Sequence, residues 1–187
     1  AKVSNSGTWS WIESGSSRNG QGFDTMDVAI DSNDTIVLTL KDSYWVSFGS
    51  YNLSATSGYP ESDIFIASLS SNRTWNWLIK AGSSGIDEPY DIAIDSEDDI
   101  YVTGYYCQGT TSCSATFGNI TLSAITTNGD SAFFTWKVNS DGYTRWVMKG
   151  DSPYQDYGTA VTIASDGSVF AAGDFCTHFS APSSCQT

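Results

Sequence analysis

Short apolar runs hinged on acidic turns recur three times along the chain. The clearest is "YDIAIDSEDDIYVTG" at 90–104, with looser copies, "MDVAIDSNDTIVLTL" from Met26 and "GTAVTIASDGSVFAAG" from Gly158. Runs rich in β-branched and aromatic residues between turn residues predict paired strands. In 92–94 the apolar residues are consecutive rather than alternating, which predicts strands covered on both faces. No period of 3.6 is sustained, so we expect almost no helix.

Tryptophans set the register of a longer repeat. Trp11, Trp77 and Trp146 are spaced by 66 and 69 residues. Each repeat reads as four β segments, which in the second repeat are 75–80, 90–94, 99–106 and 131–138. The segment "FGNITLSA" (117–124), which matches "FGSYNLSA" (48–55), adds a short fifth stretch. Small residues recur where strands would crowd together, at Ala29, Ala93, Gly104 and Gly173.

A four-stranded unit that needs copies of itself on both faces is a propeller blade. We therefore predict an all-β fold of β-propeller-like blades, each of four antiparallel strands, in about 2.8 repeats of 66–69 residues. We expect the region 1–187 to form one domain, with units at roughly 1–66, 67–135 and an incomplete 136–187. The tryptophans that follow the repeat are expected to pack between blades: Trp9, Trp11, Trp75, Trp77 and Trp146.

The repeat pattern W-x-W…G…Y-x-I-A-x-D-S…I-Y-V-T-G…F-G…L…F-x-A-K-[LV]-x-S-x-G resembles the SBBP-type β-propeller repeat of secreted bacterial and archaeal surface proteins. The resemblance covers nearly the whole chain and is closest in the second repeat; in the third, Ala164 replaces an aspartate. It implies an extracellular propeller with structural or binding duties, and it brings no catalytic motif.

The repeats start and stop out of phase. "AKVSNSGTWSW" (1–11) superposes without a gap on "WKVNSDGYTRW" (136–146), so Ala1 falls inside a predicted strand. Propellers close with ~4–8 blades. Three interpretations stay open: a piece of a longer propeller, a subunit that lends strands to neighbours in a ring or polymer, or an open stack. The expected partners are therefore further copies of the chain or the missing blades.

The net charge of the chain limits which other kinds of partner are expected. Lys+Arg number 8 against 21 Asp+Glu, for a net charge of -13. Nucleic acids and anionic membrane surfaces require a basic patch, so neither is expected to bind. No run approaches the ~18 apolar residues of a membrane span, so membrane insertion is not expected. Low charge (16%) with 14% aromatic residues suits an extracellular or cell-surface β protein.

Cysteines and sequons support that location. Cys107 and Cys176 hold the same place in successive repeats, and each has a near neighbour, Cys113 and Cys185. Of three possible connectivities, Cys107–Cys113 with Cys176–Cys185 repeats one loop twice and is favoured over the others and over a zinc site, since CxxC spacing is absent. Four Asn-x-Ser/Thr sequons predict glycosylation at Asn33, Asn52, Asn72 and Asn119.

Catalytic chemistry has little support. His178 is the only histidine, in the Cys176–Cys185 loop. "NSDGYTRW" (139–146) partly resembles the Asp-box turn of sialidase propellers, which also need an arginine cluster, and the arginines are Arg18, Arg73 and Arg145. We expect no enzyme, no catalytic residues and no cofactor. Calcium at the acidic turns Asp31/Asp34 or Asp95/Asp98 is a weaker alternative to plain hairpin turns.

The function expected from these features is that of a non-enzymatic extracellular surface or appendage protein. It would be a structural scaffold or adhesive repeat, and self-assembly into a filament is one form that it could take. A carbohydrate-binding module is the alternative, and a glycoside hydrolase-type propeller ranks below it. Aromatic residues near loops could stack on sugar rings, the candidates being Trp45, Tyr51, Tyr59, Tyr105 and Tyr106.

Overall fold

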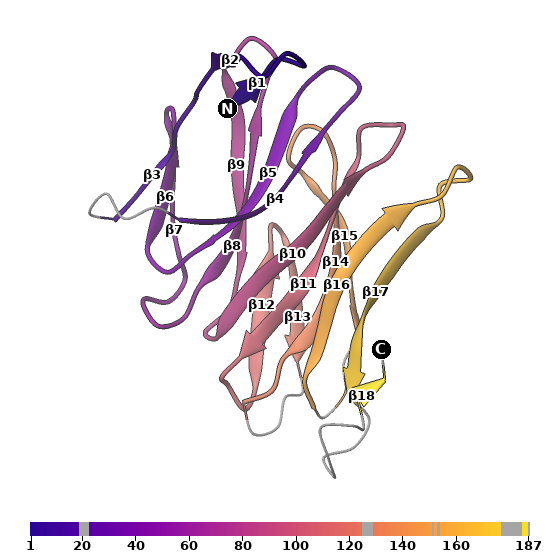
Figure 1. Ribbon diagram of the computed structural model, residues 1–187. Helices are drawn as coiled ribbons and strands as arrows, with labels where there is room; N and C mark the ends of the chain where they lie inside the picture. Colours follow the sequence, from indigo (N-terminus) through magenta and orange to yellow (C-terminus); the bar gives the residue numbers. More distant parts are fainter. Residues whose placement is uncertain (19–22, 125–128, 151, 153, 177–184, 187) are drawn as a thin grey trace.

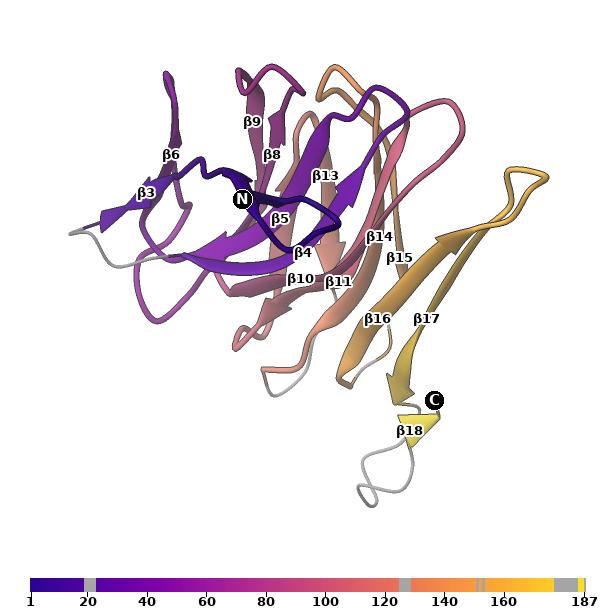
Figure 2. The same cartoon turned by 45° about the horizontal axis from the view of Figure 1, so that its top comes forward.

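The computed structural model describes residues 1–18, 23–124, 129–150, 152, 154–176 and 185–186 (Figure 1). Across these residues the chain forms strands and turns, without an α-helix, as the hydrophobic pattern predicts. The sheets are antiparallel and lie side by side, and the third repeat lies at one side of the molecule (Figure 2).

Two complete blades of four antiparallel strands lie at the centre. The first contains β4 (Asp24–Ile30), β5 (Ile36–Asp42), β8 (Asp63–Leu69) and β9 (Trp75–Gly82). The second contains β10 (Ile86–Ile94), β11 (Ile100–Gln108), β14 (Ala132–Val138) and β15 (Thr144–Gly150). Each strand pairs with the next of its blade, so the predicted β-propeller blade architecture is confirmed for these two units.

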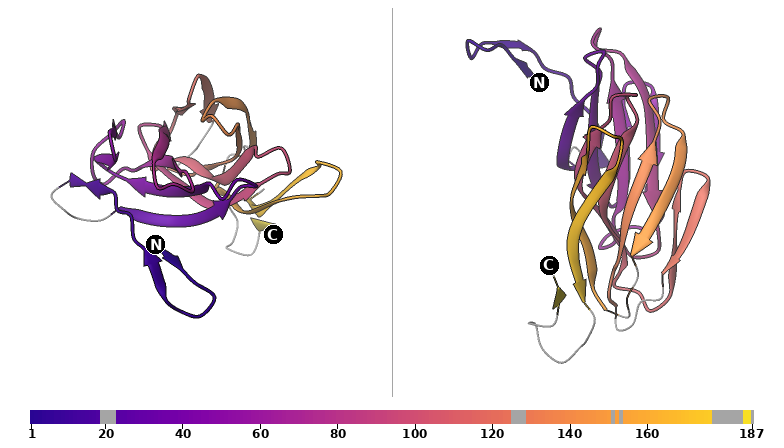
Figure 3. Two further views of the ribbon diagram at one scale, coloured as in Figure 1. Left: turned by 90° about the horizontal axis from the view of Figure 1, so that it is seen from above. Right: turned by 90° about the vertical axis from the view of Figure 1, so that its right-hand side faces the viewer.

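Half-blades flank them. On one side, β16 (Asp156–Ile163) and β17 (Val169–Cys176) take the places of the first two strands, and β18 (Cys185–Gln186) joins the end of β17. On the other side, β1 (Lys2–Val3) and β2 (Trp9–Trp11) form a separate two-stranded hairpin at the places of the last two strands, followed by β3 (Ser16–Ser17). This hairpin projects from the body of the molecule (Figure 3).

The predicted fifth stretch is a hairpin that crosses between blades. We call the two copies the straps; they are β6–β7 (Trp45–Phe48, Tyr51–Ser54) and β12–β13 (Cys113–Phe117, Ile120–Ala124). Each strap adds its first strand to the outer strand of the preceding repeat, β12 to β9 and β6 to β3. The pairings Thr116↔Gly82 and Ser47↔Ser16 are equivalent in the two repeats. The sequence predicted an extended segment here but not this link.

The core lies in the seam between the first two blades and beneath the second strap. Its largest fully buried side chains include Trp136, Tyr106, Phe117 and Phe134. The Phe117 ring lies 5.0–5.8 Å from the other three, centroid to centroid. The strap therefore brings an aromatic side chain into the core of the second blade while its backbone pairs with the first.

Aspartates on the inner strands also join neighbouring blades. Asp27 on β4 accepts a hydrogen bond from the backbone N–H of Ile92 on β10, at 3.2 Å. Asp91, its equivalent on β10, accepts one from Val161 on β16, at 2.7 Å. Burial raises the pKa of Asp91, and the neighbouring Asp27 carboxylate raises it further.

The tryptophan prediction holds in part. Trp77 is nearly buried, and its indole N–H donates to the backbone oxygen of Ser140 in the second blade, at 2.8 Å. Trp75 packs against Phe48 of its own strap, with ring centroids 4.3 Å apart. Trp9 is exposed, so the prediction that it packs between blades is wrong for this chain. Trp9 is the equivalent of Trp75, and none of the residues that the structure describes forms a strap over it.

Glycine at position 104 is required by the neighbouring strand. β10 has an irregular register between Pro89 and Asp91, and a Cβ on Gly104 would lie 2.0 Å from the backbone oxygen of Glu88. Gly173, its equivalent, would have a Cβ 1.8 Å from the oxygen of Tyr157. The prediction that small residues mark crowded strands is confirmed at these two positions.

We expect Gly104→Ala to lower the free energy of unfolding by about 3 kcal/mol, because the methyl group meets backbone that cannot rotate away. Urea unfolding followed by tryptophan fluorescence measures this change. Gly58→Ala is the control, since nothing lies within 4 Å of a Cβ built there. Equal loss of stability in the two variants would show that the close approach is unimportant.

Candidate functional site

A cleft of about 420 Å³ opens between the first and second blades. It lies where β4 and β10 begin and where β5 and β11 end. The lining side chains used below are Arg18, Asp24, Lys41, Asp42, Tyr44, Tyr59, Glu88 and Tyr105. Because they come from two repeats, the cleft exists only where two blades meet.

Glu88 organises the floor of the cleft. Its Oε1 is 2.6 Å from the ammonium of Lys41, on the first blade. Its Oε2 accepts a hydrogen bond of 2.6 Å from the hydroxyl of Tyr105. Burial raises the pKa of Tyr105, and the hydrogen bond to Glu88 raises it further. The phenol therefore stays protonated and acts as a donor, and the floor is rigid and internally paired.

The rim is aromatic and open. Tyr59 is 77% exposed. The Arg18 guanidinium stacks over the ring of Tyr44, 4.5 Å from its centroid. Asp42 accepts a hydrogen bond from the backbone N–H of Tyr44, at 2.7 Å. Apolar ring faces beside carboxylates match the surface of a sugar, whose C–H face stacks while its hydroxyls donate.

The five predicted sugar-stacking residues do not all meet at this cleft. Tyr59 and Tyr105 line it, and Trp45 lines an adjoining hollow of about 390 Å³ that shares Arg18 and Tyr44. Tyr51 instead packs the first strap onto the blade, since its hydroxyl donates to the backbone oxygen of Asn76.

Tyr105 and Tyr106 lie in a strand, as the predicted segment 99–106 has it, but this strand continues to Gln108, so neither side chain is exposed next to a loop. Both are buried within β11, which neighbouring blades and the strap cover on both faces. Tyr106 contacts Phe117 in the core and cannot meet a ligand. Lys41 and Glu88 were missed by sequence reasoning, because they sit at different positions of the repeat and leave no repeated signature.

The acidic turns at the opposite end of the blades are engaged in hydrogen bonds. Asp31 accepts the N–H groups of Asn33 and Thr35, which closes its own turn. Asp98 accepts hydrogen bonds from Ser32 and from the Asn33 amide of the first blade, so it links two turns. The calcium alternative gains no support: within the described ranges, no group of three or more His, Cys, Asp or Glu side chains is placed to hold a metal ion.

A larger cavity of about 710 Å³ lies between the second and third repeats near these turns. Its lysine is already paired, since Lys137 is 2.8 Å from Asp99 and 3.7 Å from Asp95. Burial alone would raise the pKa of Asp95, but hydrogen bonds from the Asp99 N–H and the Tyr101 hydroxyl lower it overall. We favour the first cleft as the candidate site because Tyr59 presents an exposed ring there, whereas the aromatic residue that lines the larger cavity, Tyr101, is buried.

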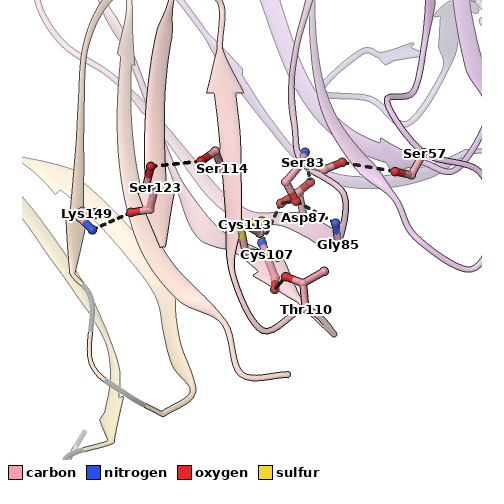
Figure 4. The surroundings of a disulfide bond; sticks show 10 residues. All are labelled: Ser57, Ser83, Gly85, Asp87, Cys107, Thr110, Cys113, Ser114, Ser123 and Lys149. Carbon is pink, nitrogen blue, oxygen red and sulfur yellow. Dashed lines mark hydrogen bonds between the residues drawn. A yellow bond between two sulfur atoms is a disulfide. The ribbon is translucent and has the colours of Figure 1, made fainter. Parts of the chain in front are cut away.

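The first predicted disulfide, Cys107–Cys113, is confirmed (Figure 4). It joins the end of β11 to the start of the second strap. The backbones of Cys176 and Cys185 pair in the β17–β18 ladder, but their side chains lie outside what the structure describes, so the second bond stays a prediction.

A buried carboxyl group, that of Asp87, lies beside this disulfide. Asp87 accepts hydrogen bonds from the Ser83 N–H, the Ser83 hydroxyl and the Cys107 N–H, at 2.6–2.8 Å (Figure 4). Its own N–H donates to Ser62, before β8 of the first blade. Asp156 and Ser152 repeat the arrangement before the third blade. We call these two groups the Ser–Asp knots, and they tie each inner strand to the blade before it.

The sequon asparagines are exposed at Asn33, Asn52, Asn72 and Asn119. Asn33 Nδ2 donates to Asp98 at 3.1 Å, so a glycan there would have to displace that contact. Occupancy of the four sites stays a prediction.

The residues considered for catalysis are dispersed. Arg18 lies beside the cleft, Arg73 in the turn between β8 and β9, and Arg145 on β15. His178 lies outside the described residues.

Four-stranded antiparallel sheets that repeat along the chain and pack on one another define a β-propeller-type repeat protein. Residues 77–105 match the family model SBBP: Beta-propeller repeat, so this segment, from Trp77 in β9 to Tyr105 in β11, is a β-propeller repeat. No curated protein matches the chain. Among the residues described, none form a helix long and apolar enough to cross a membrane.

Proposed function

We propose that this chain is a non-enzymatic scaffold of the cell exterior, a surface or appendage protein that holds adhesive loops on rigid blades. The observation that carries the proposal is that the repeated polar side chains form hydrogen bonds between blades. Asp27, Asp91, the Ser–Asp knots and the Trp77 indole all make hydrogen bonds between blades. The Cys107–Cys113 disulfide supports an oxidising compartment.

Assays for turnover test this proposal. With the purified, oxidised chain we expect no hydrolysis of fluorogenic glycosides or esters above the buffer rate. We also expect the blades to resist prolonged proteinase K digestion, because their backbone is paired within sheets. Hydrolysis that disappears in Glu88→Gln would overturn the non-enzymatic proposal, since a contaminant would not respond to that change.

Carbohydrate binding is a second candidate, favoured by one observation: an aromatic ring, Tyr59, stands open at the rim of a cleft that also carries carboxylates. The class of ligand that fits is a neutral polysaccharide. An anionic one would meet a chain of net charge -13.

We expect Tyr59→Ala to weaken binding to a neutral polysaccharide about fivefold to tenfold, the loss that one stacked ring produces. Affinity electrophoresis in gels containing dextran, mannan or xylan measures it as lost retardation. Tyr143→Ala is the matched control, because Tyr143 is 70% exposed on a turn away from the cleft. No retardation of the unmodified chain, or equal loss in both variants, would contradict the sugar-binding role.

A further inference from the structure

Every seam between blades uses the same two strand positions. The second strand contributes one side chain toward the following blade, Val37 in the first repeat and Tyr101 in the second, which are 2% and 3% exposed. The inner strand contributes one toward the preceding blade, Ile92 in the second repeat and Val161 in the third, 7% and 6% exposed. Val37 and Ile92 belong to one buried cluster, which identifies the contact.

The same two positions are uncovered at the ends of the stack. Phe170 on β17 is the equivalent of Val37 and Tyr101, and it is 60% exposed. Val28 on β4 is the equivalent of Ile92 and Val161, and it is 57% exposed, with Ile30 exposed beside it. The third repeat thus presents one half of a seam, and the first blade presents the other half. We call them the Phe170 face and the Val28 face.

The two half-blades, β16–β17 and β1–β2, also complement each other in strand order. Strands β16–β17 occupy the first two places of a blade, and β1–β2 the last two. In the second blade β11 pairs with β14 through Ile100↔Val138 and Tyr101↔Lys137. Transferred by the repeat, this register places Val3 opposite Val169 and Lys2 opposite Phe170.

The edge of β17 is open where this pairing would form. Among the described residues, β17 pairs with β16 along one side and with β18 only at Phe175 and Cys176 on the other. The β1–β2 hairpin projects outward, away from the blades of its own chain (Figure 3).

We propose that a second copy of this chain docks head to tail. The Phe170 face of one copy packs on the Val28 face of the next, and the β1–β2 hairpin of that next copy pairs with β17. The existing seams argue for this partner, because its surface has the register, the side chains and the strand order that each face already meets inside the chain.

The blade count favours a closed dimer. Each copy holds two complete blades and, with its neighbour, completes one more, so two copies give six blades. Head-to-tail contacts form a ring when the rotation closes and a filament when it does not. Propellers close with ~4–8 blades, so two copies fall within that range and three, with nine blades, exceed it.

The new seam would lack one bond that the internal seams have. The third repeat carries Ala160 where the first two carry Asp27 and Asp91, so no carboxylate reaches across to the next inner strand. The contact is therefore apolar and edge-to-edge. This assembly deepens the proposed scaffold, yet a monomeric chain would leave the turnover predictions untouched.

Light scattering after size-exclusion chromatography, together with sedimentation velocity, tests the proposal on the oxidised chain. We expect the mass of two chains, and negative-stain class averages that show a closed ring. Phe170→Asp and Val28→Asp should each lower the mass to one chain, with the circular dichroism spectrum unchanged because both side chains are already exposed.

Thr121→Asp is the control, since Thr121 is exposed on β13 of the second strap, outside both faces, and this variant should remain dimeric. A monomeric unmodified chain, a polydisperse polymer, or a dimer that survives Phe170→Asp would overturn the closed dimer.

Discussion

Replacing Phe117 by alanine is expected to lower the free energy of unfolding by about 4 kcal/mol, the cost of emptying a fully buried aromatic site. The side chain is 0% exposed and touches the rings of Tyr106, Phe134 and Trp136. Its backbone pairs with Ala81 of the first blade. The substitution therefore loosens the core of one blade and the attachment of the strap to another.

Chemical denaturation followed by circular dichroism and by tryptophan fluorescence measures this effect. Thr121→Ala, on the exposed side of the same strap, is the control and should change stability by no more than about 0.5 kcal/mol. If the two variants were equally stable, Phe117 would not anchor the strap.

The stability of the chain is expected to fall as the pH rises from about 4 to about 8 because of Asp87. Burial raises the pKa of Asp87 from the usual 3.8 to about 8, although the Cys107 N–H and Ser83 favour the charged form. Between those values the unfolded chain has lost the proton that the folded chain retains. Raising the pH therefore favours unfolding, with the loss complete above the folded-state pKa.

Asp87→Asn isolates this contribution, because an amide is neutral throughout the range. We expect the stability advantage of the unmodified chain over the variant to shrink between pH 5 and pH 8, as measured by urea midpoints at each pH. Asp141→Asn, in an exposed turn, controls for the loss of one surface charge. A difference between chain and variant that is independent of pH would show that Asp87 is already ionised at pH 5.

The blades could be predicted because each repeats its own pattern. Consecutive apolar residues such as Ile92–Ile94 signal strands covered on both faces, and Cys107 with Cys113 repeats a loop. These features are local to one repeat, so one sequence is enough to find them.

The cleft and the strap links could not be predicted, because they join repeats. Lys41 and Glu88 meet across a seam but occupy unrelated positions, and the β12–β9 ladder rests on backbone groups that leave no mark in the side-chain pattern. The burial of Tyr106 was missed for the same reason, because the Phe117 ring that packs against it comes from the strap, whose position the sequence does not give.

The straps impose an order on biosynthesis. Since β12 pairs with the end of β9, at Ala81 and Gly82, the first blade is not finished until residues some thirty positions further along have emerged from the ribosome. The strap of each newly made repeat therefore completes the strand pairing of the blade made before it. A deletion within a repeat would remove that pairing from the preceding blade as well. Gain or loss of whole repeats avoids that damage, so such chains should change in length by complete units.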